Sequence, residues 1–171
     1  LQSYHNQYPL RRGAPSQEIR SRLSLSQPVY LQVLSRLSAD GAVVEESQQL
    51  RLPDHQVALT PQMEQSAAAY LASLENQPFS PPTDHPPDPE LLAAMVDMGQ
   101  VVKVNESVVF AASAYGQLVD RIKIHIQEKG SITVAEGRTL FDTSRKYILP
   151  LLEYLDQQRI TRRVGDERVL R

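Results

Sequence analysis

Apolar residues recur along the chain at helical spacing, and each helical stretch is followed by a short β-branched hairpin. The three hairpins are predicted to begin at Ala42, Val101 and Ile160, so both intervals are 59 residues. Self-similarity at a fixed period indicates repeated structural units, and a unit of this size can fold when it shares interfaces with its neighbours. The pattern predicts three domains, at residues 1–57, 58–112 and 113–171.

The first unit is predicted to contain two helices before its hairpin. One covers residues 16–23, and Ser26 is placed to cap the next, with Pro28 in its first turn, where a missing N–H costs little. The apolar face of this second helix follows the spacing i, i+3, i+4, i+7 and consists of Tyr30, Val33, Leu34 and Leu37.

The last unit is predicted to repeat this order with an added helix at residues 115–128. Thr133 and Glu136 have the spacing of a capping box at the start of the next helix. Thr143 or Ser144 is expected to cap a third helix, whose core face consists of Ile148, Leu151, Leu152 and Leu155. The hairpin that follows is predicted to turn at Gly165 and Asp166.

The middle unit departs from this order. A helix is predicted from Pro61 to about Leu74, and a short one at residues 90–98 with Asp88 as its cap. Between them, six of the twelve residues 78–89 are Pro, which excludes a helix and favours a polyproline-like loop. We expect this acidic, Pro-rich stretch to be a spacer between the outer units.

Helix, helix, helix, hairpin is the order of a winged helix, a helix-turn-helix followed by a two-stranded wing. We therefore predict an α+β, mostly helical fold of three tandem winged-helix domains. The alternative is a generic tandem of small α+β domains, which the hairpin after each third helix disfavours.

Composition and charge narrow the function. The chain has no Cys, which excludes disulfides, thiolate metal sites and cysteine catalysis and fits a cytoplasmic location. Nucleotide-binding glycine loops and hydrolase elbows are absent, and the four His lack metal-ligand spacing, so we expect no enzyme, metal or cofactor in this chain. Residues 1–114 carry a net charge of −5, from 7 Lys and Arg against 12 Asp and Glu, whereas residues 115–171 carry +3, from 11 against 8. This asymmetry indicates an anionic partner for the last unit.

The candidate contact residues lie at two places in that unit. Ser144, Arg145 and Lys146 stand at the start of the third helix, where free N–H groups and the helix dipole favour phosphate. Arg162 and Arg163 stand on the wing, where neighbouring side chains point to opposite faces. Either one of them packs on the domain, or the twist at the wing tip lets both reach one ligand. Pro150 inside the helix favours contact at the first turn over reading along a duplex groove.

The last unit resembles the end of bacterial selenocysteine-specific elongation factors, and Tyr4-His5 and Pro9-Leu10-Arg11 resemble an earlier winged domain of that family. The strongest resemblance lies in residues 143–156, TSRKYILPLLEYLD, and residues 161–171, TRRVGDERVLR. In that family a GTPase precedes four winged helices, and the last of these binds a hairpin in selenoprotein mRNA beside an in-frame UGA codon. The resemblance implies that this chain is a monomeric piece spanning the second to fourth winged helices.

The resemblance also implies partners and a site. The RNA-binding residues would be Arg145, Lys146, Arg162 and Arg163, with Ser144 and Gly165 as weaker candidates. The ribosome and selenocysteyl-tRNA would be partners of the full-length factor, and GTP and Mg²⁺ would belong to its GTPase, outside this chain. A ribosome or tRNA contact at Arg11, Arg12, Arg20 and Arg22 of the first unit is a further alternative to a solvated surface.

Two other function classes stay open from the residues alone. A DNA-binding transcription regulator would prefer duplex DNA to an RNA hairpin, and the acidic first two units disfavour it. A protein-interaction scaffold of winged helices would show no salt-dependent binding to nucleic acid.

Overall fold

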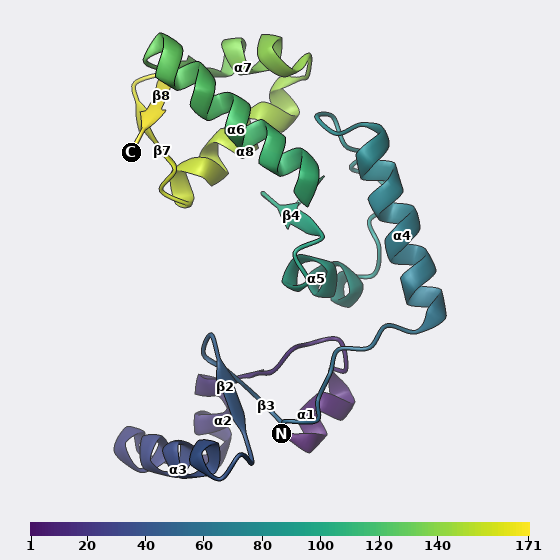
Figure 1. Cartoon of the computed structure of the whole chain (residues 1–171), viewed down its shortest axis with the longest axis vertical. Helices are drawn as coiled ribbons and strands as arrows, with labels where there is room; N and C mark the ends of the chain where they lie inside the picture. The colour runs from purple at the N-terminus through teal and green to yellow at the C-terminus, as the bar shows by residue number, and fades with distance from the viewer. The chain divides into compact units, whose positions relative to one another are not determined.

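The computed structural model describes the whole chain, residues 1–171, as eight helices and three small antiparallel sheets (Figure 1). It divides into two compact units, unit 1 (Leu1–Glu64) and unit 2 (Gln65–Arg171). Unit 1 holds the first winged helix, and unit 2 holds the middle and last ones apart from the first turn of α4. None of the helices combines the length and apolar character needed to cross a bilayer.

The first winged helix matches the predicted order of elements. Its sheet has the strand order β1-β3-β2, and Leu50 of β3 pairs with both Ala14 and Glu45. Ser26 is the N-cap residue of the third helix, with Pro28 in the first turn. The elements are α1 (Gln2–Gln7), β1 (Ala14–Pro15), α2 (Ser16–Leu23), α3 (Gln27–Ala39), β2 (Val44–Glu46) and β3 (Gln49–Arg51).

The middle winged helix lacks a second helix, as the prolines predicted. Asp88 caps its second observed helix, because its Oδ1 accepts hydrogen bonds from the N–H groups of Glu90 at 2.9 Å and Leu91 at 3.4 Å. The elements are α4 (Pro61–Asn76), α5 (Pro89–Asp97), β4 (Val101–Lys103) and β5 (Val109–Ala111).

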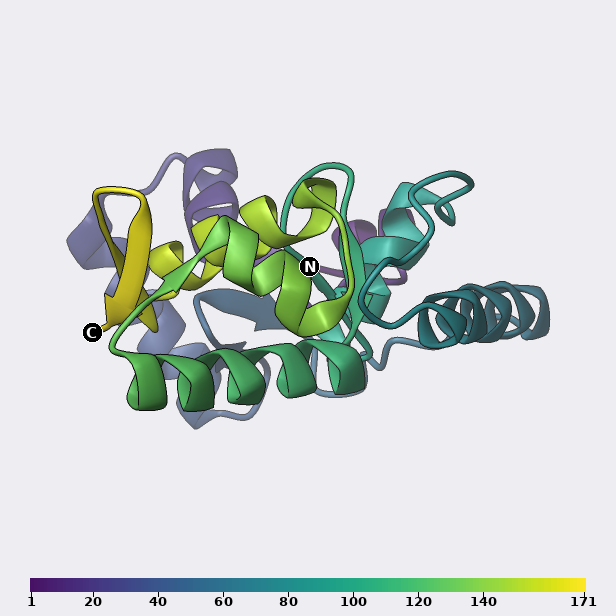
Figure 2. The ribbon, with the colours of Figure 1, turned by 90° about the horizontal axis from the view of Figure 1, so that it is seen from above.

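The last winged helix is complete, with α6 running along it and the wing near one end of α6 (Figures 1 and 2). The predicted capping box is present, since Thr133 Oγ1 accepts from the N–H of Glu136 and Glu136 Oε2 accepts from the N–H of Thr133. Gly137 lets α7 approach α8, because a Cβ there would lie 2.9 Å from Ile148 Cγ2. The elements are α6 (Ala112–Lys129), β6 (Ile132–Thr133), α7 (Val134–Phe141), α8 (Arg145–Gln157), β7 (Thr161–Val164) and β8 (Glu167–Leu170).

The outer winged helices are separated by two predicted periods of 59 residues, because α3 begins at Gln27 and α8 begins 118 residues later at Arg145. The predicted core face of α8 is buried throughout, whereas the predicted apolar face of α3 is buried only in part. Val33 is 41% exposed and Leu37 is 38% exposed, so two of the four residues of that face lie outside the core. Their counterparts Leu151 and Leu155 are 0% exposed, in a core to which α6 contributes. The physical reason is the length of the helix that packs on this face. The first helix of the last domain, α6, has 18 residues, whereas the corresponding helix α1 has 6.

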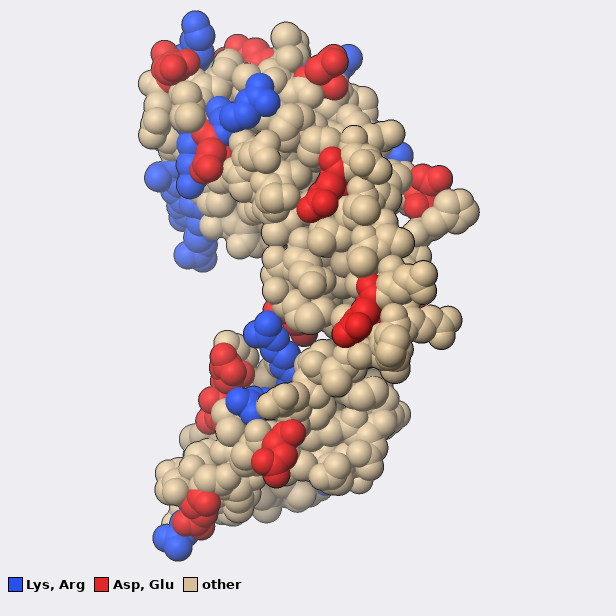
Figure 3. Space-filling model, turned by 45° about the vertical axis from the view of Figure 1, so that its right-hand side comes forward, with Lys and Arg blue, Asp and Glu red and all other residues tan.

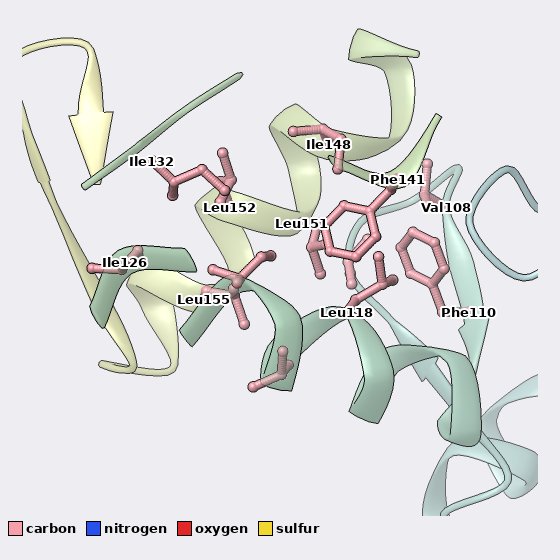
Figure 4. Packing of buried hydrophobic residues seen from close by; sticks show 13 residues of the cluster. Val108, Phe110, Leu118, Ile126, Ile132, Phe141, Ile148, Leu151, Leu152 and Leu155 are labelled. Atoms are coloured by element: carbon pink, nitrogen blue, oxygen red, sulfur yellow. The ribbon is translucent and has the colours of Figure 1, made fainter. Parts of the chain in front are cut away.

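One hydrophobic core joins the middle and last winged helices. Val108 and Phe110 belong to the middle hairpin, and they pack in the same buried cluster as Leu118 of α6 and Leu151 of α8 (Figure 4). Phe79 of the Pro-rich segment packs against this cluster as well. The prediction that this segment is a mere spacer is therefore wrong, because an aromatic side chain within it finds apolar surface on the last winged helix.

A buried histidine ties the two ends of the first winged helix together. His5 is 4% exposed, and its Nε2 accepts a hydrogen bond from the N–H of Leu52 at 3.2 Å. Its ring stacks on that of His55 at 3.6 Å between centroids. Burial, followed by the nearby positive charges of His55, the N-terminal amino group and Arg51, lowers the pKa of His5 below its ordinary value.

We expect acidification to destabilise unit 1. Only neutral His5 can accept the Leu52 hydrogen bond, and the unfolded chain takes up the proton more readily than the folded one. Stability is thus complete above the unfolded pKa of about 6.5 and falls as the pH drops from there through the lower folded pKa. Urea unfolding between pH 5 and 8 checks this, with His5→Gln as the control that should lose this part of the pH dependence. An equal pH dependence in both proteins would refute the role of His5.

Candidate nucleic-acid interface

The first turn of α8 has backbone donors with no partner in the chain. Ser144 is the N-cap residue, with extended backbone, but its side chain makes no capping hydrogen bond. The N–H groups of Tyr147 and Ile148 both donate to the carbonyl of Ser144, at 3.1 and 3.3 Å. The N–H groups of Arg145 and Lys146 precede the helical ladder, so they remain available to an anion.

Thr143 does not cap the helix either, contrary to one of the two predicted choices. Its hydroxyl donates to the carbonyl of Phe79 at 2.7 Å. A hydroxyl has one proton, so Ser80 must be the donor in the second contact, which joins the Ser80 and Thr143 hydroxyl oxygens at 2.7 Å. The turn between α7 and α8 is therefore bound to the Pro-rich segment, and the start of α8 is left without a side-chain cap.

The two cations of this turn differ in their surroundings. Arg145 is exposed, and its guanidinium has no hydrogen-bond or ion-pair partner within the chain. Lys146 is also exposed, but its Nζ donates to Thr83 Oγ1 at 2.7 Å and lies 5.4 Å from the centroid of the Tyr147 ring. Neither cation is neutralised by a carboxylate.

The wing presents one unpaired arginine and one that is held. Both Arg162 and Arg163 are exposed. Arg163 folds back on the turn, with Nε donating to the Gly165 carbonyl at 2.7 Å and a guanidinium nitrogen 3.5 Å from Asp166. Arg162 makes no such contact. Gly165 itself forms the turn with φ of +60°, which suits its lack of a Cβ.

The arginine that packs on the domain is Arg168, and not Arg162 or Arg163. It lies opposite Arg163 in the register of the hairpin, and its side chain is 3% exposed. Its Nε is 3.4 Å from Asp156 Oδ2, while Asp156 Oδ1 accepts a hydrogen bond from Thr161 at 2.6 Å. This buried contact fixes the base of the wing against α8.

Figure 3 shows a group of Lys and Arg side chains along one edge of unit 2, with acidic and other basic side chains scattered over the rest of that face. The structure thus places the predicted site residues in two groups: Ser144, Arg145 and Lys146 at the start of α8, and Arg162, Arg163 and Gly165 on the wing. The sequence did not predict that Phe79 and Thr83 contact the residues at the start of α8. The only sequence signal for such a contact was one aromatic residue inside a Pro-rich segment.

Arg11 and Arg22 of the first winged helix are engaged in contacts of their own. Arg22 pairs with Glu18 at 2.7 Å. Arg11 lies over the ring of Tyr8 at 4.0 Å and donates to the Tyr4 hydroxyl at 3.1 Å. These contacts favour a structural role over an anion site. No group of three or more His, Asp or Glu side chains is placed to hold a metal ion.

Two family models match the chain, both described as the winged helix of elongation factor SelB. One is the model of the second winged helix and matches residues 1–52, and the other is the model of the third and matches residues 124–170. Together they cover 99 of the 171 residues. The model that matches the last domain is that of the third winged helix, whereas the resemblance implied the fourth.

Three individual proteins are similar to this chain. The selenocysteine-specific elongation factor of Desulfomicrobium baculatum is 26% identical over 183 residues, which span all of this chain but 29% of the relative. A crystal structure of a bacterial selenocysteine-specific elongation factor, EF-Sec, superposes with a TM-score of 0.50 at 16% identity, covering 93% of this chain and 26% of that one. The mRNA-binding domain of SelB from E. coli, solved with SECIS RNA, gives a TM-score of 0.45 at 26% identity over 47% of this chain and 67% of that one.

The outer winged helices match successive SelB models, and the full length aligns with a factor several times longer. The chain therefore belongs to the SelB family of selenocysteine-specific elongation factors and comprises winged helices of its C-terminal region.

Proposed function

We propose that this chain is the mRNA-binding part of a selenocysteine-specific elongation factor and that its last winged helix binds an RNA stem-loop. The observation that carries the proposal is the uncapped first turn of α8, where two exposed cations flank unpartnered backbone donors. Phosphate is the ligand that such a turn favours. Family membership supplies the second line of support.

The shape of α8 favours RNA ends and loops over a duplex groove. Pro150 lies inside the helix, and the carbonyl of Lys146 loses its i+4 partner there. Beyond the first turn, Ile148, Leu151 and Leu152 are buried. A-form RNA has a major groove too narrow for side chains, so proteins contact its phosphates and unstacked loop bases. A helix with cations only at its start suits that mode of contact.

The wider activity belongs to the full-length factor. In that setting the bound mRNA hairpin would hold the factor beside a UGA codon, so that the ribosome inserts selenocysteine from its tRNA. GTP and Mg²⁺ would be bound by a GTPase outside this chain, and the chain itself would act as a monomeric, non-enzymatic binding module in the cytoplasm.

We expect the chain to bind an RNA stem-loop more tightly than duplex DNA of matched sequence. The reason is the placement of the cations at the first turn of α8 and on the wing, instead of along a groove-reading helix face. A gel shift with both probes at two salt concentrations checks this. Preference for the duplex would support a DNA-binding regulator, and salt-independent or absent binding would support a protein-interaction scaffold.

Removing both cations of α8 should weaken RNA binding and flatten its salt dependence. Each phosphate contact that is lost in the Arg145→Ala, Lys146→Ala double variant should reduce the salt slope by about 0.7–0.9. The two residues are exposed and make no ion pair, so circular dichroism should show an unchanged fold. Unchanged affinity and slope in the folded variant would move the site away from α8.

The two wing arginines should contribute unequally. Arg163 already contacts the Gly165 carbonyl and Asp166, whereas Arg162 has no partner within the chain. We expect Arg162→Ala to reduce the affinity for the stem-loop by about tenfold, and Arg163→Ala by clearly less. Fluorescence anisotropy titrations of the two variants measure the difference. A larger loss with Arg163→Ala would mean that its contacts with the turn are exchanged for RNA.

A further inference from the structure

The Pro-rich segment of the middle winged helix reaches both ends of the candidate RNA site on α8. At one end, Phe79 and Ser80 hold Thr143 by the two hydrogen bonds described above. At the other, Thr83 accepts a hydrogen bond from the ammonium group of Lys146 at 2.7 Å. These are contacts between residues 63 and 64 positions apart in the sequence.

Apolar packing anchors the segment. The rings of Phe79 and Phe141 meet edge to face at 5.3 Å between centroids. The guanidinium of Arg121 lies over both rings, 5.6 Å from the centroid of Phe79 and 4.7 Å from that of Phe141. A hydrogen bond from Arg121 to the Leu140 carbonyl at 2.6 Å also fixes this guanidinium. Thr83 therefore starts from a held position, four residues beyond an anchored aromatic ring.

The chemistry of the contact between Thr83 and Lys146 indicates whether it positions the Lys146 ammonium for a phosphate or masks its charge. A carboxylate at this position would neutralise the ammonium, but Thr83 offers a neutral hydroxyl and uses one of three N–H donors. Lys146 remains exposed, with two donors for a phosphate. Asp84, the nearest acidic residue in sequence, has its carboxylate 3.9 Å from the ring of His85. The contact restrains a flexible side chain and leaves its charge in place.

We propose that the Pro-rich segment is a positioning element of the RNA site, in which Thr83 holds the Lys146 ammonium where it meets a phosphate. The inference rests on the proposed function and deepens it. Holding a long side chain before binding removes part of the conformational entropy that binding would otherwise cost. The middle winged helix, which lacks a helix-turn-helix of its own, thereby contributes to recognition by the last one.

The test compares RNA affinity and salt slope in the full chain for Thr83→Val, Thr83→Ser and Lys146→Ala, alone and combined. Valine keeps the shape of threonine and removes the acceptor, so Thr83→Val should weaken binding by about 2- to 10-fold. The salt slope should not change, because Lys146 still neutralises the same phosphate, whereas Lys146→Ala should reduce it. Thr83→Ser keeps the hydroxyl and should retain most of the affinity.

A double-mutant cycle identifies the route of the effect. If Thr83 acts through Lys146, Thr83→Val should have no further effect in the Lys146→Ala protein. Thr139→Val is the matched control, because the hydroxyl of Thr139 bonds only to the Ala135 carbonyl in its own helix. Thermal melting should show that every variant is folded.

Three results would overturn the proposal while leaving the proposed function intact. Tighter binding by Thr83→Val would show that the contact masks Lys146. An equal loss with and without Lys146 would show that Thr83 acts on the fold. Unchanged affinity would show that the contact has no role in binding. If the unmodified chain fails to bind the stem-loop at all, the proposed function and this inference fall together.

Discussion

The packing of the middle hairpin against α6 and α8 is the interaction on which the organisation of unit 2 depends. Val108 and Phe110 are each 1% exposed, and the surfaces that bury them belong to the last winged helix. The two domains therefore share one hydrophobic cluster, as expected for units of about 60 residues that bury too little surface alone. Fixed packing here also brings the Pro-rich segment to the start of α8.

The outer winged helices show how much cover a recognition helix needs. On α8, the apolar face is closed by an 18-residue helix and the wing is fixed at its base by the Arg168–Asp156 pair. On α3, the same face carries exposed Val33 and Leu37, and β2 has three residues where β7 has four. The two domains share an order of elements, but only the last combines a closed core with exposed, unpaired cations. That combination holds the cations on a rigid base.

Local signals predicted most of the fold. The bounds of α2, the cap at Asp88 and the Thr133–Glu136 capping box depend on nearby residues in the sequence, and the structure contains each of them. Ser26 occupies the predicted N-cap position, but its side chain makes no capping hydrogen bond. The exposure of Val33 and Leu37 could not be predicted this way, because periodicity identifies an apolar face without identifying what covers it. The Thr83–Lys146 contact depends on how two domains pack, which no local pattern encodes.

The prediction that Arg162 or Arg163 packs on the domain is wrong, because both side chains are exposed. The arginine that packs there is Arg168 on the facing strand. The deciding factor was Asp156 of α8, whose carboxylate accepts from Thr161 and Arg168 together. Candidate cations taken from one strand cannot reveal which of them a buried carboxylate will hold.

Surface loops rich in proline ordinarily tolerate insertions, because few contacts depend on their length. The segment between α4 and α5 is different, since Phe79 and Thr83 are each attached to the neighbouring domain. One residue added between these two attachment points would force one contact to break or α8 to shift. The length of this segment, more than its composition, is therefore the property that sets where Thr83 meets Lys146. A change in length that touches no charged residue would move the cation at the start of α8.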